Sequence, residues 1–121
     1  MKTILIVDDE KNIRKLYERE LHRDGYKVVV ASSGEEALAI VNASPPDLIV
    51  LDIRMPQMNG IETLNRLMVK HRHIPVILNS AYSSYKDDYL TWAADAYVIK
   101  SADMDELKSR IKEILDKQPS A

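Results

Sequence analysis

Three carboxylates in this sequence stand directly after short apolar runs. Asp8 and Asp9 follow "TILIV", and Asp52 follows "DLIVL". Carboxyl groups that converge repel one another, and each is then stabilised by protonation, by a cationic partner or by a metal ion. Mg²⁺ takes one or two carboxylates together with a carbonyl and several waters. We therefore expect a Mg²⁺ site at Asp8, Asp9 and Asp52, provided that the ends of the two runs meet.

A hydroxyl and a cationic side chain stand at the ends of two further apolar runs. Ser80 follows "PVILN", and Lys100 ends "AYVIK". Opposite a metal ion, these two groups would complete a cradle for the oxygens of a phosphoryl group. A carboxylate can itself be the nucleophile and form an aspartyl phosphate. Asp52 stands alone at the end of its run and is the candidate nucleophile.

The apolar runs and the segments between them predict the elements that position these side chains. The runs are rich in Ile, Val and Leu without alternating polar residues, which is typical of parallel strands buried on both faces; they are 3–7, 27–31, 47–51, 75–79 and 96–100. Helical spacing of apolar residues separates them: Ile13, Leu16, Leu21; Ala37, Leu38, Val41; Ile61, Leu64, Leu67, Met68; and Met104, Leu107, Ile111, Ile114. We expect an α/β domain with an open parallel sheet and helices on both faces.

The starts of the predicted helices are marked by pairs of residues with capping spacing, in which a side chain binds a backbone N–H three residues later. These pairs are Ser33 with Glu36, Asn59 with Glu62, Ser84 with Asp87, and Asp103 with Glu106. The fourth helix in chain order is predicted at about 84–92. Its aromatic residues, Tyr85, Tyr89 and Trp92, form either a stripe packed on the sheet or a surface that faces a partner.

Length, charge and composition limit the classes of protein that this chain can be. Its 121 residues suit a single domain, 1–121, with 116–121 as a frayed tail. The net charge of -2 argues against direct contact with nucleic acid or a membrane surface. The absence of cysteine excludes disulfides and thiol nucleophiles. The first apolar run ends too early, at Asp8, for a signal peptide, so we expect a cytoplasmic protein.

From "ILIVDDE" through "LIVLDIRMPQMNG" and "PVILNSAY" to "DAYVIK", the sequence resembles the response-regulator receiver domain of two-component signalling. The resemblance covers essentially the whole chain, and Met55–Pro56 and Gly60 match the turn that follows the phosphoacceptor in that family. It implies a flavodoxin-like, doubly wound five-stranded sheet with five helices and strand order 2-1-3-4-5. The second strand, which ends in Ala31 and Ser32, then lies away from the site.

The resemblance also implies roles for the residues at the strand ends. Asp52 would be the phosphoacceptor, receiving its phosphoryl group from a phosphohistidine on a sensor histidine kinase or histidine phosphotransfer protein. Asp9, Asp52 and the backbone carbonyl of Arg54 would bind Mg²⁺ directly, and Asp8 would act largely through a water on the ion. The domain would catalyse its own phosphorylation and dephosphorylation without being an enzyme in the usual sense.

The expected output is a change of surface. Lys100 would pair with the phosphoryl group, and Ser80 would be the switch hydroxyl that draws the loop after the fourth strand inward. Tyr97, the switch aromatic, would then move and change the face formed by the helix at about 84–92, the fifth strand and the last helix. The recipient is a downstream protein or an output domain absent from this sequence.

One residue departs from the family pattern. Ser101 follows Lys100, where the family usually has a proline joined by a cis peptide bond. A cis bond before a residue other than proline costs about 2.5–4 kcal/mol. We expect the Lys100–Ser101 bond to be trans, or to be held cis at the expense of stability. A trans bond brings the reach of Lys100 into question.

Two other functions compete with the phosphoacceptor. The departure at Ser101 favours a degenerate receiver that binds proteins without being phosphorylated. A phosphatase of the haloacid-dehalogenase kind also uses an aspartyl nucleophile, but it needs a second Asp two residues later as general acid and base. Arg54 stands at that position and cannot serve.

Overall fold

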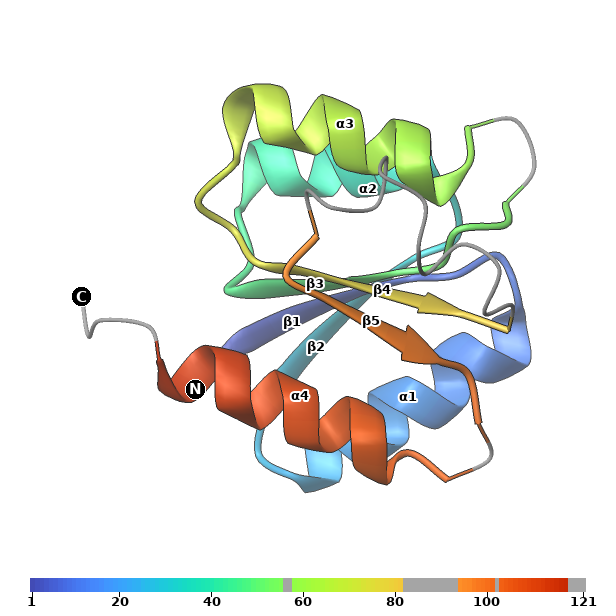
Figure 1. Ribbon diagram of the computed structural model, residues 1–121, viewed down its shortest axis with the longest axis vertical. Helices are drawn as coiled ribbons and strands as arrows, with labels where there is room; N and C mark the ends of the chain where they lie inside the picture. The colour runs from blue at the N-terminus through green and yellow to red at the C-terminus, as the bar shows by residue number, and fades with distance from the viewer. Residues whose placement is uncertain (56–57, 82–93, 102, 118–121) are drawn as a thin grey trace.

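The computed structural model describes residues 1–55, 58–81, 94–101 and 103–117. Figure 1 shows how strands and helices alternate along the chain. They are β1 (Thr3–Val7), α1 (Lys11–Arg23), β2 (Lys27–Ala31), α2 (Gly34–Ala43), β3 (Leu48–Leu51), α3 (Gly60–Lys70), β4 (Val76–Ser80), β5 (Ala96–Ile99) and α4 (Asp105–Asp116). All five predicted strands and four predicted helices are confirmed. The helix expected at about 84–92 and the tail from 118 to 121 lie outside the described residues.

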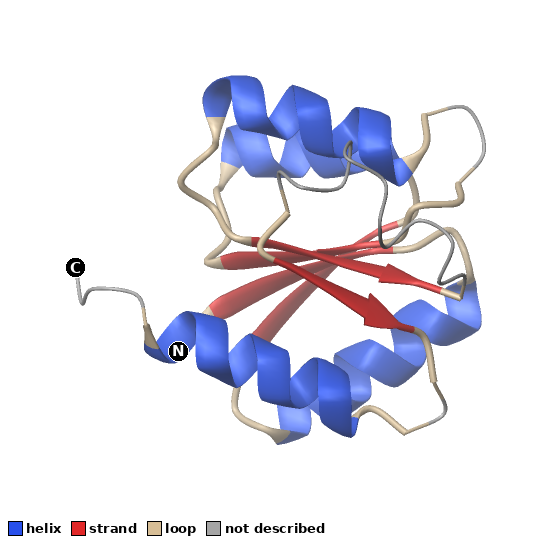
Figure 2. Ribbon diagram, in the orientation of Figure 1, coloured by secondary structure: helices blue, strands red, loops and turns tan. Residues whose placement is uncertain are grey.

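The five strands form one parallel sheet between two layers of helices. The strand order is β2-β1-β3-β4-β5, and every neighbouring pair is parallel. Helices α2 and α3 cover one face of the sheet, and α1 and α4 cover the other (Figures 1 and 2). The predicted doubly wound fold and its order 2-1-3-4-5 are therefore confirmed.

Alternating side chains of each strand enter opposite layers, which explains why the strands carry no polar alternation. In β1, Leu5 and Val7 belong to the core shared with α2 and α3. Ile4 and Ile6 belong to the core shared with α1 and α4. Both faces of the sheet are thus buried, as expected for parallel strands connected by helices. The strands' polar groups are confined to their ends.

Two of the predicted helix starts are confirmed and one is wrong. Ser33 accepts a hydrogen bond from Glu36 N at 3.1 Å, and Asn59 does the same from Glu62 N at 2.9 Å. Helix α4 instead begins at Asp105 without a side-chain cap, because Asp103 Oδ1 accepts from Asp105 N at 2.9 Å, one residue short of Glu106. Within the described segments, every helix is too short or too polar to cross a membrane.

Gly60, the first residue of α3, fixes that helix against the backbone that carries Asp52. Its N–H donates to the carbonyl oxygen of Ile53 at 2.7 Å. A Cβ at this position would collide with the backbone carbonyl of Asp52 and would lie 2.7 Å from Ile53 Cα. Both obstacles are backbone atoms, so no side-chain rotation relieves them. The absence of a side chain is therefore what allows α3 to start so close to the site.

We expect Gly60→Ala to lower the free energy of unfolding by about 1–3 kcal/mol, because the added methyl group forces the backbone at Asp52 to shift. Urea unfolding followed by circular dichroism measures this. Gly25→Ala is the matched control, because Gly25 has φ +97° but open space where a Cβ would lie. Its substitution should lower the free energy of unfolding by about 1 kcal/mol, through the left-handed backbone alone. A Gly60→Ala protein as stable as the wild type would contradict the close approach of α3.

Candidate functional site

The residues singled out in the sequence meet at the carboxyl edge of the sheet. Backbone hydrogen bonds to neighbouring strands hold three of them there. Asp8 N donates to the carbonyl of Ala31 at 3.1 Å, Asp52 N donates to that of Val7 at 2.9 Å, and Lys100 N donates to that of Ser80 at 2.7 Å. The sheet register therefore places the carboxylates and the lysine side by side.

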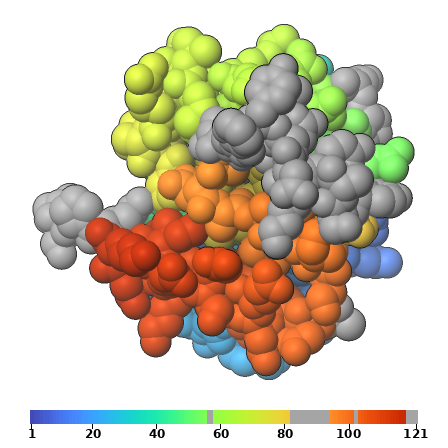
Figure 3. Space-filling view, viewed as in Figure 1, coloured from blue at the N-terminus to red at the C-terminus, as the bar shows by residue number. Residues whose placement is uncertain are grey.

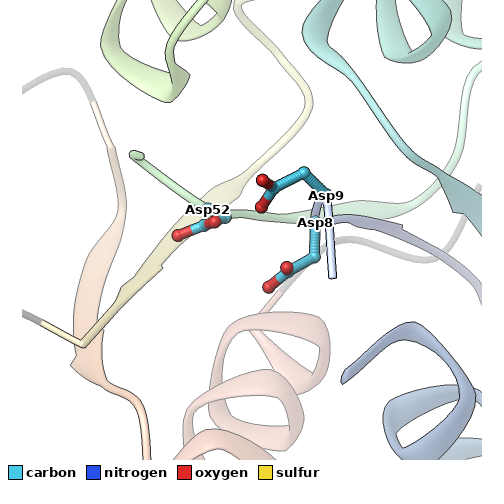
Figure 4. Close-up of side chains that lie close together, drawn as sticks. All are labelled: Asp8, Asp9 and Asp52. Carbon is cyan, nitrogen blue, oxygen red and sulfur yellow. The ribbon is translucent and has the colours of Figure 1, made fainter. Parts of the chain in front are cut away.

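Asp8, Asp9 and Asp52 form a compact acidic cluster. One carboxylate oxygen from each lies within 4.8 Å of the others, and Figure 4 shows the three carboxyl groups projecting together from the ends of β1 and β3. Asp8 and Asp52 are only 2% and 5% exposed, whereas Asp9 is exposed. The cluster is thus open to solvent on the side of Asp9 and closed beneath. The predicted convergence of the three side chains is confirmed.

Lys100 reaches this cluster. Its Nζ lies 2.8 Å from Asp8 Oδ2 and 3.5 Å from Asp52 Oδ1, and its side chain is largely buried. The described part of the chain contains no cis peptide bond, so Lys100–Ser101 is trans. The trans bond does not prevent the lysine from reaching the carboxylates, because β5 ends at Ile99 and delivers Lys100 directly over the sheet edge.

Asp8 has further partners that fix its orientation. Its Oδ1 accepts from Glu10 N at 2.9 Å, and its backbone carbonyl accepts from Arg14 Nη1 at 2.8 Å. With Lys100 on the other oxygen, the Asp8 carboxylate is well stabilised as an anion. Asp52 has only the longer contact to Lys100 among the ion pairs of the described residues. The two buried carboxylates therefore experience different surroundings.

The surroundings of Asp52 raise its pKa. Burial, followed by the charge of Asp8, raises the pKa of Asp52 from 3.8 to about 6, although Lys100 acts in the opposite direction. Burial also lowers the pKa of Lys100, but the Asp8 and Asp52 carboxylates more than offset this, so that the pKa of Lys100 is raised. The lysine is therefore a permanent cation beside a carboxyl group that loses its proton reluctantly.

The donor set suits a hard divalent cation. Three carboxylate oxygens within 4.8 Å offer the oxygen ligands that such ions prefer. A cation there would also relieve the repulsion that raises the pKa of Asp52. The acidic cluster can thus hold a metal ion. The Lys100 ammonium already neutralises part of the negative charge of this cluster.

The remaining predicted site residues surround the cluster. Ser80 is buried at the last position of β4. Tyr97 on β5 packs partly buried against the core of α2 and α3. Arg54, two residues after Asp52, is exposed and lines a surface cavity of about 340 Å³. Tyr85, Tyr89 and Trp92, predicted as an aromatic stripe, lie outside the described residues.

Sequence reasoning missed a buried polar pair beneath the cluster. Asn79 Nδ2 donates to the hydroxyl of Tyr17 at 2.8 Å, and the two side chains are 2% and 3% exposed. In the sequence, Asn79 stands out as an amide near the end of a mostly apolar strand. Tyr17 gave no signal, because an aromatic residue on the buried face of α1 is ordinary. Only the tertiary structure brings the two together.

In metal-free buffer with EDTA, we expect Asp52→Asn to be more stable than the wild type at about pH 7.5, by about 3 kcal/mol. Between the ordinary pKa of 3.8 and the folded pKa of about 6, the folded protein binds more protons than the unfolded chain. The free energy of unfolding therefore falls as pH rises through this window, and the loss is complete above it. The advantage of Asp52→Asn should vanish towards pH 4.

Urea unfolding at several pH values measures the difference. Asp116→Asn, which removes an exposed carboxylate at the end of α4, is the matched control and should follow the wild type closely. An Asp52→Asn protein that tracks the wild type at every pH would show that the neighbours of Asp52 do not destabilise its anion.

Comparisons with known proteins agree with this geometry. Residues 4–112 match the response regulator receiver domain family. The chain is 40% identical over 116 residues to the alkaline phosphatase synthesis transcriptional regulatory protein PhoP of Bacillus subtilis, a match that covers 94% of this chain and 48% of PhoP. The chain thus spans about half the length of the curated relatives that it matches first.

Solved structures agree with the family. The response regulator protein TrrA from Thermotoga maritima, solved in complex with Mg²⁺–BeF, has a TM-score of 0.92 and 46% sequence identity, and the match covers 94% of this chain and 99% of TrrA. TrrA solved in complex with the histidine kinase ThkA has a TM-score of 0.90 at 46% identity, covering 95% and 99% of the two chains. The match of residues 4–112 to the family model and the likeness to these solved structures lead to one conclusion: this chain belongs to the response regulator receiver domain family.

Proposed function

We propose that this chain is a phosphoacceptor domain in which Asp52 receives a phosphoryl group from a phosphohistidine. The observation that carries the proposal is the convergence of Asp8, Asp9 and Asp52 within 4.8 Å, with Lys100 Nζ 3.5 Å from Asp52. The family match and the kinase complex of TrrA support a sensor histidine kinase or a histidine phosphotransfer protein as donor. We also propose a cytoplasmic location for this chain.

We propose that Mg²⁺ is the resident cation, by analogy with the TrrA complex. Asp9, Asp52 and the backbone carbonyl of Arg54 would hold it directly, with Asp8 behind them. When bound, the ion supplies positive charge that offsets the charge on the phosphoryl oxygens. Lys100 supplies the same kind of charge from the protein itself, and its ammonium can donate hydrogen bonds to those oxygens.

In the transfer step, a carboxylate oxygen of Asp52 attacks phosphorus. The new O–P bond forms as the P–N bond to the donor imidazole breaks, and the departing ring nitrogen takes a proton from solvent. The product is an acyl phosphate. The same pocket admits water, which can attack phosphorus and return Asp52 and inorganic phosphate. Both half-reactions would be catalysed by the domain on its own residue.

Phosphorylation replaces the single negative charge of the Asp52 carboxylate by roughly -1.5 to -2 and adds new acceptor oxygens there. Ser80 stands at the end of β4 and can donate its hydroxyl hydrogen to one of these oxygens. Tyr97 lies beside β4, in register with Leu78, so inward movement of the β4 end changes its packing. We propose that this shifts the population of two arrangements of the face formed by the segment at about 84–92, β5 and α4.

Strand β5 and helix α4 lie side by side on the face shown in Figure 3, where a downstream protein or an attached output domain can contact both. The relatives that the chain matches are about twice its length, which supports an output domain in those proteins. We propose a protein, rather than nucleic acid or a membrane, as the direct partner of this domain.

Incubation with Mg²⁺ and acetyl phosphate should give a hydroxylamine-labile phosphate on the wild type, because the product is an acyl phosphate; mass spectrometry of the intact protein detects it. Asp52→Asn should gain none, and the control Asp116→Asn should label as the wild type does. Equal labelling of Asp52→Asn would assign the acceptor elsewhere. A wild type that stays unlabelled with acetyl phosphate and with phosphorylated kinases would favour a receiver that binds partners without phosphorylation.

Lys100→Met should slow phosphorylation by on the order of 10²-fold at saturating Mg²⁺, because a donor of positive charge is lost from the transition state. A time course of phosphate incorporation measures the rate. Lys112→Met, an exposed lysine on α4, is the matched control and should leave the rate unchanged. Equal rates for the two variants would remove Lys100 from the proposed machinery.

A further inference from the structure

Asn79 lies in the same row of the sheet as the two buried carboxylates. The register pairs Val7 of β1 with Leu51 of β3, and Leu51 with Leu78 of β4. One step further along each strand, the row reads Asp8, Asp52, Asn79. An amide therefore sits directly beside the proposed phosphoacceptor, on the strand that separates it from β5.

These side chains also share one face of the sheet. Two residues before each of them, Ile6, Val50 and Ile77 belong to the core shared with α1 and α4, and side chains two apart in a strand point to the same face. The contact of Asn79 with Tyr17 on α1 agrees with this. Lys100 stands two residues after Val98, which belongs to the same core and is paired with Asn79.

The amide of Asn79 is only half satisfied. Its Nδ2 donates to Tyr17, but Oδ1 has no partner, the one such buried side-chain atom in the described part of the chain. A buried acceptor without a donor costs about 1–3 kcal/mol. Apolar residues in place of both Asn79 and Tyr17 would avoid that cost, so their mutual hydrogen bond does not by itself account for an amide in this strand.

The candidate donor for this oxygen is Lys100, which directly follows the neighbouring strand β5, two residues after the partner of Asn79 in the sheet. The ammonium of Lys100 has three N–H groups, and its contacts within the site are to Asp8 and Asp52. A divalent cation at the acidic cluster would compete with the ammonium for the negative charge of Asp8 and Asp52 and would repel it. Lys100 then needs an acceptor away from Asp8, and the neighbouring strand β4 offers Asn79 Oδ1.

The hydroxyl of Tyr17 lies within the electrostatic influence of the same groups. Burial raises the pKa of Tyr17, the hydrogen bond from Asn79 and the charge of Lys100 act against this, and the charges of Asp8 and Asp52 add to it. The buried pair is thus part of the surroundings of the cluster, rather than a separate feature of the core.

We propose that Asn79 is a positioning residue for Lys100. Its amide oxygen accepts a hydrogen bond from the Lys100 ammonium when a divalent cation occupies the acidic cluster, and the hydroxyl of Tyr17 holds the amide in place. The inference rests on the proposed cation site at Asp8, Asp9 and Asp52. The amide oxygen of Asn79 is then a neutral acceptor that lowers the free-energy cost of moving the Lys100 ammonium away from Asp8.

The test compares cation affinity with and without the ammonium. The double variant Tyr17→Phe/Asn79→Leu removes every polar atom of the pair and is made in the wild type and in Lys100→Met. Isothermal titration with MgCl₂ gives the affinities, and urea unfolding in EDTA gives the stabilities. We expect the double substitution to weaken Mg²⁺ binding about tenfold when Lys100 is present and to leave it unchanged in Lys100→Met.

Stability and matched controls separate positioning from a structural role. In EDTA the double variant should be at least as stable as the wild type, since it removes an unsatisfied acceptor. Thr63→Val, which removes a buried hydroxyl on α3 in the opposite layer, should leave Mg²⁺ affinity unchanged. Tyr17→Phe alone keeps the ring and should give a smaller loss of affinity that again depends on Lys100.

Three results would overturn the inference. An unchanged Mg²⁺ affinity of the double variant in the wild-type background would show that Asn79 does not serve the lysine. An equal loss in both backgrounds would show that the pair acts on the cluster through packing. A wild type that itself fails to bind Mg²⁺ would overturn the proposed cation site, and this inference with it.

Discussion

The mutual repulsion of three carboxylates at one edge of a parallel sheet governs the rest of this structure. A buried pair of carboxylates, Asp8 and Asp52, is tolerated because the Lys100 ammonium contacts both and because Asp8 also accepts a hydrogen bond from the backbone N–H of Glu10. Burial, followed by the charge of Asp8, raises the pKa of Asp52 to about 6. A site prepared in this way gains stability from any added positive charge.

The architecture supplies this convergence without any special loop. Parallel strands bring all their carboxyl ends to one edge, so a residue that directly follows a strand is placed by the register of the sheet. Strands β1, β3 and β5 each deliver one polar side chain in this manner, and Gly60 holds the start of α3 against the backbone of Asp52. The described helices cover the two faces of the sheet.

Local sequence patterns were sufficient to predict the strands and the meeting of the residues at their ends. The five apolar runs gave the strands, and because Asp8, Asp9, Asp52 and Lys100 stand at strand ends, their meeting followed from the topology. The helix start predicted at Asp103 is wrong because the Asp103 side chain accepts a hydrogen bond from Asp105 N, two residues later. This bond competes with the predicted one to the N–H three residues later. The reach of Lys100 past a trans bond depends on where β5 ends, and the Asn79–Tyr17 pair joins residues 62 apart, so neither had a local signal.

Because side chains alternate along the strands, the two layers contain different functional residues. Asp8, Asp52 and Lys100 belong with the layer of α1 and α4, whereas Tyr97 packs into the layer of α2 and α3. The charged groups at the sheet edge and the ring of Tyr97 thus lie on opposite faces of the sheet and are linked through the backbone of the strands. A substitution confined to one layer therefore alters the packing of that layer first, and its effect reaches the other layer through the strands.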